Sequence, residues 1–356
     1  MGMLLSLFKG ILSESGRVQP TVKEKQAETD ALRKLWRRGQ GAPVNGIAID
    51  YSFYSPVEHG ADPAKKYPLV IIMAGALEGV VPGFELTANA LAYWTAPHIQ
   101  ARFPNGGAYL LIGRAPEEKK LYWDSTRLTA PFKAAIDGFI AANENVDTQR
   151  IYSIGWCLGG TGSLNLAAGY PGFFAAAIVI TPSRPFSHTE ARRLANTPFW
   201  LMGCKADNYV SYRGIVQKSQ TRLNRCAKAP AEKLLTSCET APDVFLAEVI
   251  PFIQNHDMWD TLAEDMRPDK PTLTGLVTEN GAGNAVETPQ AVKWLTSFTS
   301  PPQAEPFTPC KRDLAVRLYE RFEAPKRANL LLVLLHVLDR RGFIDLYPKK
   351  KKKKKK

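Results

Sequence analysis

Cysteine, histidine and aspartate occur in this chain in an order that can carry nucleophilic catalysis. An apolar run ends at Gly155, and the segment Gly155-Trp156-Cys157-Leu158-Gly159 leads into a helix-prone stretch. In a Gly-x-Cys-x-Gly pattern of this kind, a sharp strand-to-helix turn presents the nucleophile at the end of a sheet. Glycines are expected two residues before and after Cys157, because side chains there would collide in so tight a turn. The start of a helix also favours a thiolate, the reactive form of cysteine.

An acid and then a histidine should follow such a turn, each just after a later strand. Asp207 follows the apolar run 199–202, and His256 follows the run 245–250. The other two histidines beyond Cys157 precede Asp207 or lie in the C-terminal extension, so only His256 fits the order. The spacing predicts that His256 is the base and that Asp207 orients it.

Two other acids compete with Asp207 for this role. Asp257 and Asp260 lie close to His256 in the sequence. A carboxylate so near along the chain has difficulty reaching the far ring nitrogen of the same histidine. Asp207 is therefore the expected partner.

Two backbone amides are expected to bind the oxyanion of an acyl intermediate. The N–H of Leu158 is the first. The second is expected from the loop after the apolar run 69–73, where Gly75 lets the backbone turn and Ala76 or Leu77 would donate. Aromatic side chains near these motifs are candidates for substrate binding: Trp123, Trp156 and Trp259.

Short apolar runs alternate with helix-period segments over about 250 residues, which predicts an α/β fold with a mostly parallel central sheet and helices on both faces. Expected strands are 47–54, 69–73, 109–112, 151–154, 174–180, 199–202 and 245–250, and expected helices include 130–142, 158–168 and 291–298. The whole chain is expected to divide into four regions. These are an N-terminal arm or lead-in helix over 1–44, a catalytic domain over 45–300, a proline-rich linker with a helical extension over 301–348, and a polylysine tail over 349–356.

The net charge of +12 is concentrated at one end of the chain. The tail 349–356 supplies eight of these charges, which leaves +4 on the rest. No basic stretch is interleaved with aromatic residues, so nucleic-acid binding is not expected. If the tail is native, it could contact an anionic surface. No apolar run reaches the roughly 18 residues that a membrane-spanning helix needs.

The five cysteines are too few for a disulfide scaffold in a chain of 356 residues. Free thiols and a cytoplasmic location are expected, although a bridge between Cys226 and Cys238 in a secreted protein stays open. The cysteines have no metal-type spacing, and neither a metal nor an organic cofactor is expected. The sequence leaves the oligomeric state open.

Residues 67–298 resemble the α/β-hydrolase superfamily, and within it the esterases grouped with polyhydroxybutyrate depolymerases, feruloyl esterases and predicted peptidases. The similar stretches are 146–155, which leads into the turn, and 169–177, which follows it. The resemblance implies a Ser–His–Asp triad, here Cys157, His256 and Asp207. Two departures are the cysteine in place of serine and Ala74-Gly75 in place of His-Gly. The turn itself is similar to that of dienelactone hydrolases, which carry cysteine.

These residues predict a hydrolase that cleaves a carboxylic ester, lactone or thioester, small or polymeric, through an acyl-enzyme intermediate. Three alternatives stay open. One is a non-catalytic binding protein that kept the fold, and another is a variant in which cysteine replaced serine and traps an acyl group. The third is a redox-sensing or acyl-carrying thiol protein. A glycine-rich turn around an inert, buried Cys157 would fit the first of these.

Overall fold

The computed structural model describes residues 30–75, 88–116, 121–241, 256 and 275–300. The chain divides into two units, 1–304 and 305–356. The second unit, with the proline-rich linker and the lysine tail, lies outside the described residues. The predicted run 245–250 lies outside them as well.

One sheet of ten strands runs through the first unit, in the order β1-β2-β4-β3-β5-β6-β7-β8-β9-β10. The six strands from β4 to β8 in this order are parallel, and antiparallel strands flank them at both ends. The strands are β1 Arg37–Gln40, β2 Asp50–Tyr54, β3 Tyr67–Met73, β4 Tyr109–Arg114, β5 Val146–Trp156, β6 Ala176–Ile180, β7 Phe199–Cys204, β8 Lys233–Cys238, β9 Val277–Asn280 and β10 Ala285–Val286.

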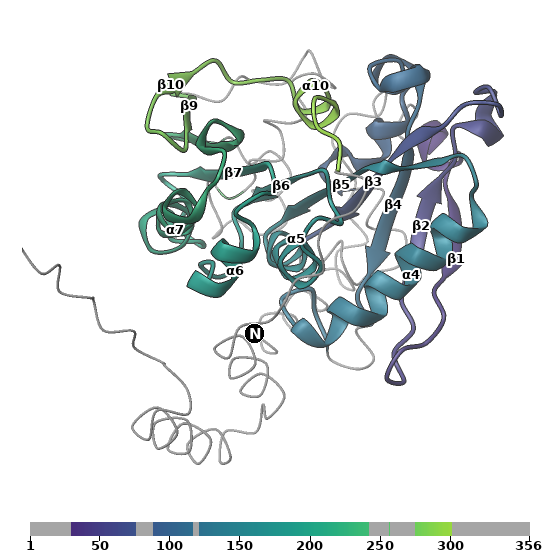
Figure 1. Ribbon diagram of the computed structural model, residues 1–356. Coiled ribbons are helices and arrows are strands. Elements are labelled where there is room, and N and C mark those ends of the chain that lie inside the picture. Colours follow the sequence, from purple (N-terminus) through teal and green to yellow (C-terminus); the bar gives the residue numbers. More distant parts are fainter. Residues whose placement is uncertain (1–29, 76–87, 117–120, 242–255, 257–274, 301–356) are drawn as a thin grey trace, which may run out of the picture. The chain divides into compact units, whose positions relative to one another are not determined.

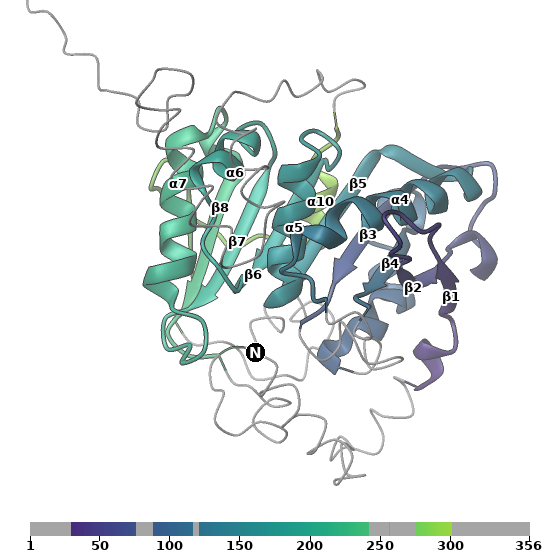
Figure 2. The ribbon, with the colours of Figure 1, turned by 90° about the horizontal axis from the view of Figure 1, so that it is seen from below.

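Helices cover both faces of this sheet. Helices α4 to α7 lie on one face and α10 on the opposite face, as both views show (Figures 1 and 2). The α-helices are α3 Pro97–Gln100, α4 Thr129–Ala142, α5 Leu158–Gly169, α6 His188–Arg193, α7 Lys218–Cys226 and α10 Ala291–Thr296. The 3-10 helices are η1 Val57–His59, η3 Ala88–Thr95, η4 Pro104–Gly106, η6 Thr126–Leu128 and η8 Pro230–Glu232, and η7 Tyr212–Gln217 is a π-helix.

The central strands are apolar because they are covered on both faces. Every residue of β3, β6 and β7 is buried. On the α10 face, the ring of Trp294 packs edge-on against Trp200 of β7, with 5.4 Å between centroids. Helix α5 is buried along its length from Leu158 to Ala168, so it forms the centre of the layer on the opposite face.

The order of the strands reverses at β3. The chain passes from β3 to β4 on one side and then returns to form β5 on the other side of β3. In open α/β sheets, ligands bind beyond the carboxyl ends of the strands at such a switch point. The C-terminal end of β5 is therefore where a site is expected, and Cys157 directly follows it.

The predicted α/β architecture is confirmed, with differences in particular elements. All six predicted strands in the described part of the chain exist, with shifted ends. The region 1–44, expected to be an arm or a lead-in helix, contains strand β1, which pairs with β2 at the edge of the sheet. Strand β8 was not predicted, because its sequence Lys-Leu-Leu-Thr-Ser-Cys mixes polar and apolar residues although all six are buried.

Lys233, the first residue of β8, is fully buried. Its Nζ donates a hydrogen bond to the carbonyl oxygen of Thr197. Burial lowers the pKa of Lys233 from 10.5 to about 8, against a smaller raising effect from the charge of Glu232. The folded protein therefore loses this proton at a lower pH than the unfolded chain does.

This shift predicts how stability depends on pH. The pKa of Lys233 is lower in the folded than in the unfolded protein. The contribution of neutral Lys233 to the free energy of unfolding is therefore fully present above pH 10.5 and is lost as the pH falls through about 8. The Lys233→Met variant should be more stable than the parent at pH 7, by about 2 kcal/mol. Its advantage should shrink between pH 8 and 10.5. Urea unfolding at several pH values measures this, with the exposed Lys218→Met as control. A constant difference across the range would contradict the prediction.

Candidate functional site

A strained backbone turn carries Cys157. Its φ and ψ are 55° and −118°, a conformation that residues with a side chain rarely adopt. Its N–H donates to the carbonyl oxygen of Ile180 at 3.0 Å, and its own carbonyl accepts the N–H of Thr161 at 3.1 Å. The turn thus joins the end of β5 to the start of α5, and it is held to the neighbouring strand β6. Strain of this kind persists only where the surrounding structure enforces it, and it is typical of functional sites.

The glycines at 155 and 159 are required by close backbone contacts. A Cβ atom on Gly155 would lie 2.2 Å from the carbonyl oxygen of Gly159. A Cβ atom on Gly159 would lie 2.0 Å from the carbonyl oxygen of Met73 and 2.2 Å from that of Ala74. The start of α5 therefore lies directly against the end of β3, and this approach fixes the position of Cys157.

Asp207 lies in the turn that follows β7. Its Oδ1 accepts the N–H groups of Tyr209 and Val210, both at 2.8 Å. Its Oδ2 accepts a hydrogen bond from Nδ1 of His256 at 2.8 Å, and the Asp207 side chain is only 1% exposed. The carboxylate is thus held by two amides and turned toward the imidazole, as the sequence predicts for the orienting acid.

His256 is buried between this carboxylate and the Cys157 thiol. Burial on its own lowers the pKa of His256. The charge and hydrogen bond of Cys157, together with those of Asp207, outweigh burial and raise the pKa of His256 to about 10. The imidazole therefore holds a proton at neutral pH and interacts with the thiol on one side and the carboxylate on the other. The three predicted residues come together; their roles in catalysis stay a prediction.

Two aromatic side chains fix the imidazole ring. Trp156 Nε1 donates to the carbonyl oxygen of His256 at 3.2 Å, and their ring centroids are 5.3 Å apart. The ring of Tyr209 meets His256 edge-on, also at 5.3 Å, and is 44% exposed. Burial and then the charges of Cys157, Asp124 and Asp207 raise the pKa of Tyr209. Sequence reasoning did not single out Tyr209, although its position two residues after the acid was a signal.

Leu158 is the first residue of α5. The first N–H groups of a helix have no partner within the helix, which is consistent with the predicted role of this amide as a donor to an oxyanion; that role stays a prediction. Ala76 and Leu77, the candidates for the second amide, lie outside the described residues. Trp259, Asp257 and Asp260 also lie outside them.

Thr181 is a feature of this end of the sheet that sequence reasoning missed. It follows β6 directly, where Ile180 pairs with Trp156, and its φ is 38°. A positive φ is a marked outlier for a β-branched residue. Its Oγ1 is buried and has no hydrogen-bond partner among the described residues. Its backbone is fixed by a hydrogen bond from its N–H to the carbonyl oxygen of Met202 at 2.9 Å.

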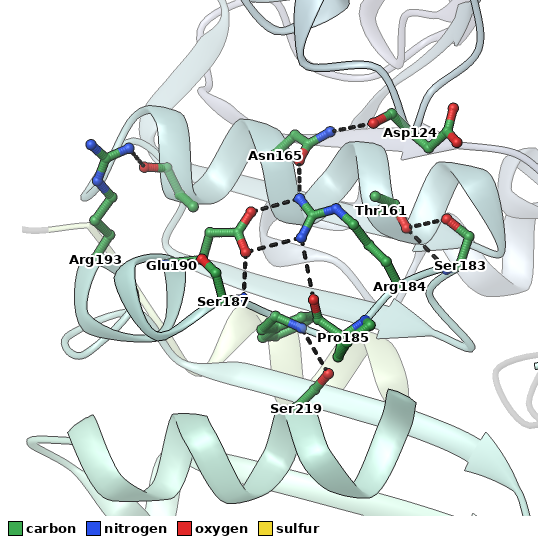
Figure 3. Close-up of polar contacts among 12 residues, drawn as sticks. Asp124, Thr161, Asn165, Ser183, Arg184, Pro185, Ser187, Glu190, Arg193 and Ser219 are labelled. Carbon is green, nitrogen blue, oxygen red and sulfur yellow. Dashed lines mark hydrogen bonds and ion pairs between the residues drawn. The ribbon is translucent and has the colours of Figure 1, made fainter. Parts of the chain in front are cut away.

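A partly buried polar network holds the segment 182–190 against α5 (Figure 3). The guanidinium of Arg184 forms two parallel hydrogen bonds to Glu190, at 2.6 and 3.0 Å, and a third to Oδ1 of Asn165 on α5 at 2.6 Å. Burial would raise the pKa of Glu190, but Arg184 and Ser187 lower it on balance. Thr161 Oγ1, one turn into α5, accepts the N–H of Ser183 at 2.9 Å. The helix that follows Cys157 is therefore tied to α6 on its outer side.

Trp123 lies in the core rather than beside His256. Its ring packs against Phe132 of α4, with 4.7 Å between centroids, and only 2% of its surface is exposed. Its backbone and Cβ lie against Gly162 of α5. Its predicted contact with substrate has no support in these contacts, and it stays a prediction.

No group of three histidine, cysteine, aspartate or glutamate side chains could hold a metal ion in the part of the chain that the structure describes. Within the same residues, no helix combines the length and apolar character needed to cross a membrane. The four cysteines of the described residues, Cys157, Cys204, Cys226 and Cys238, form no disulfide in the structure, and the register partner of Cys238 is Cys204 rather than Cys226.

Comparison with known proteins supports the same fold. A solved structure described as a thermostable esterase superposes with a TM-score of 0.56 and 21% identity, over 76% of this chain and 64% of that chain. The chain has the α/β-hydrolase fold. Residues 113–227 match the model of the dienelactone hydrolase family, a wider region than the turn around Cys157. Lipase 1 of Moraxella sp. (strain TA144) is 26% identical over 138 residues, 38% of this chain and 39% of that protein. The chain thus matches less than two thirds of either relative.

The contacts of Gly159 predict a large difference between two glycine substitutions. Gly159→Ala should destabilise the protein by about 3 kcal/mol, since its Cβ would meet two backbone carbonyls. Gly138→Ala, on an exposed part of α4 where a Cβ meets nothing within 4 Å, should stabilise it by about 0.5–1 kcal/mol. Urea unfolding midpoints test both. Equal midpoints for Gly159→Ala and the parent would show that the turn is not as tight as described.

The Asp207–His256 hydrogen bond predicts how Cys157 reacts with iodoacetamide. In the parent, His256 has a pKa of about 10 and holds the proton, so the rate should change little between about pH 7 and 9. In Asp207→Asn, the pKa of His256 should fall, and the rate at pH 7 should drop about tenfold and rise with pH. Mass spectrometry of Cys157 peptides measures the rate. Asp137→Asn on the surface of α4 is the matched control, and a parent-like profile for Asp207→Asn would refute the assignment.

Proposed function

We propose that this protein hydrolyses carboxylic esters or related acyl compounds, including lactones and thioesters, with Cys157 as nucleophile. The observation that carries the proposal is the hydrogen bond of 2.8 Å between Asp207 and His256, on an imidazole that also interacts with Cys157. The match to the dienelactone hydrolase family and the similarity to a lipase support an ester or lactone as the substrate class.

The reaction would begin with the proton on His256 and the charge on Cys157. Asp207 stabilises the imidazolium and keeps Nδ1 facing the carboxylate, which leaves Nε2 for the reacting groups. The thiolate attacks the acyl carbon, and the N–H of Leu158 donates to the oxygen that becomes negatively charged. His256 then gives its proton to the leaving oxygen or sulfur, and an acyl-thioester forms on Cys157.

Water completes the cycle. The imidazole, now neutral, takes a proton from a water molecule that attacks the thioester. The second tetrahedral intermediate collapses with expulsion of the Cys157 thiolate, and the product acid leaves. No step in this sequence needs a metal or an organic cofactor.

A cysteine nucleophile favours activated acyl donors. In the first tetrahedral intermediate, the thiolate is a better leaving group than an alkoxide. The intermediate therefore returns to substrate unless the other leaving group is stabilised, as in aryl or enol esters, strained lactones and thioesters. The exposed ring of Tyr209 beside His256 offers an apolar contact for such a leaving group.

Intact-mass measurement after brief exposure to p-nitrophenyl acetate tests the proposal. The parent should gain one acetyl group and lose it with time, whereas Cys157→Ala should gain none at this site. Cys226→Ala, which removes a partly buried thiol at the end of α7, should behave like the parent.

Other outcomes would separate the alternatives. A stable acetyl adduct on Cys157 would indicate an acyl-trapping or acyl-carrying protein rather than a hydrolase. Absence of any adduct on a folded parent would overturn the catalytic role of Cys157 and favour a binding protein with an inherited fold.

A further inference from the structure

Two cysteines outside the candidate active site lie side by side at the C-terminal ends of β7 and β8. Cys204 and Cys238 are register partners in the parallel ladder, and neither has any exposed surface. Neighbouring strands lie about 4.8 Å apart, which is inside the range of roughly 4.4–6.8 Å between Cα atoms that a disulfide requires. Partners in register also direct their side chains to the same face of the sheet. Neither residue forms a disulfide in the structure.

The surroundings of Cys204 favour its ionised form. A hydrogen bond from the Cys238 thiol, with further hydrogen bonds from the backbone amides of Ala206 and Ala241, lowers the pKa of Cys204 despite its burial and the nearby charge of Asp207. In its protonated form, the Cys204 thiol donates a hydrogen bond to the carbonyl oxygen of Glu239 at 3.3 Å. Cys204 and Cys238 are thus directly hydrogen-bonded to each other, and the lowered pKa makes Cys204 the candidate for the thiol that ionises.

The pair lies at the base of the turn that carries the orienting acid. The carbonyl of Cys204 accepts the N–H of Asp207 at 3.3 Å, and the N–H of Lys205 donates to the carbonyl of Cys238 at 2.9 Å. Any change in the distance between the two cysteines therefore acts on the backbone three residues from the carboxylate that holds His256.

We propose that Cys204 and Cys238 form an oxidisable dithiol that hydrogen peroxide closes to a disulfide, with an effect on the nearby Asp207–His256 pair. The Cys204 thiolate attacks one oxygen of the peroxide, which gives a sulfenic acid and releases hydroxide. The Cys238 thiol then attacks the Cys204 sulfur, the S–S bond forms, and water leaves. The two thiols lose two electrons in total, and the peroxide gains them. Reduction by a dithiol reverses the change.

The expected effect on the site follows from the contacts of Cys204. Closure brings the two sulfurs from hydrogen-bond contact to a covalent bond, and it removes the thiol hydrogen that Cys204 donates to the carbonyl oxygen of Glu239, so the start of the turn must adjust. Positioning errors of about 1 Å in a catalytic group can cost roughly 100-fold in rate. We expect a smaller displacement at Asp207 and a reversible loss of about tenfold in ester turnover.

The thiol pair is tested first without the active-site cysteine. Full-length Cys157→Ala is treated with hydrogen peroxide, remaining thiols are alkylated, and the digest is searched by mass spectrometry for linked peptides. Peptides that join Cys204 to Cys238 are expected, and dithiothreitol should remove the link. The same link should form when Cys226→Ser is added, whereas adding Cys238→Ser should abolish it. A folded protein in which no link forms, or in which Cys226 is the partner, overturns the proposal.

The coupling to Asp207 is tested by comparing the parent with Cys238→Ser before and after peroxide. Cys157 is present in both, so its own oxidation lowers turnover equally, and the additional reversible loss in the parent reports the disulfide. Equal losses of turnover in the two proteins would show that the disulfide does not affect the position of Asp207. The search for linked peptides needs no catalytic activity. It therefore tests the Cys204–Cys238 disulfide even if the protein is not a hydrolase.

Discussion

The tight turn at Cys157 is the constraint on which the rest of the site depends. Its positive φ brings the start of α5 against the end of β3, at a distance that excludes a Cβ at Gly159. That approach requires a helix that can be buried along its whole length, and α5 meets the requirement with small and apolar residues. The strain of the turn is balanced by its surroundings. On one side Cys157 is hydrogen-bonded to β6, and on the other α5 is tied to α6 through Arg184 and Glu190.

The parallel strands bring Cys157 and Asp207 to the same edge of the sheet. Because β5, β7 and β8 run in the same direction, the residues that follow them emerge at one edge of the sheet. Cys157 follows β5, and Asp207 lies in the turn after β7, where two backbone amides hold its carboxylate. His256 comes from farther along the chain and is fixed by Asp207, Trp156 and Tyr209. Among the described residues, the groups that hold His256 therefore lie at or just after the ends of β5 and β7.

The sequence revealed these residues because their chemistry imposes spacing and steric rules. Gly155 and Gly159 are required by backbone contacts, and Cys157 and Asp207 follow the ends of β5 and β7 in chain order. Features without such rules escaped prediction. Strand β8 has no apolar period, since its buried residues include Lys233 and Thr236, which find partners only in the folded sheet. The positive φ of Thr181 is set by tertiary contacts, and the pairing of Cys204 with Cys238 depends on the register between two strands 34 residues apart.

The electrostatics around His256 suit a thiol better than a hydroxyl. Burial alone would favour a neutral imidazole, and the charge of Cys157 is the largest influence that opposes it. A serine at position 157 would carry no charge before the reaction, so that contribution would disappear and His256 would retain a much lower pKa. The proton would then reside on the hydroxyl in the resting state, as a general-base mechanism requires. In the proposed mechanism, the same Asp207–His256 pair could serve either nucleophile, but only the thiol allows charge separation before substrate binds. The preference for substrates with good leaving groups has a separate cause: the thiolate is itself readily expelled from the first tetrahedral intermediate.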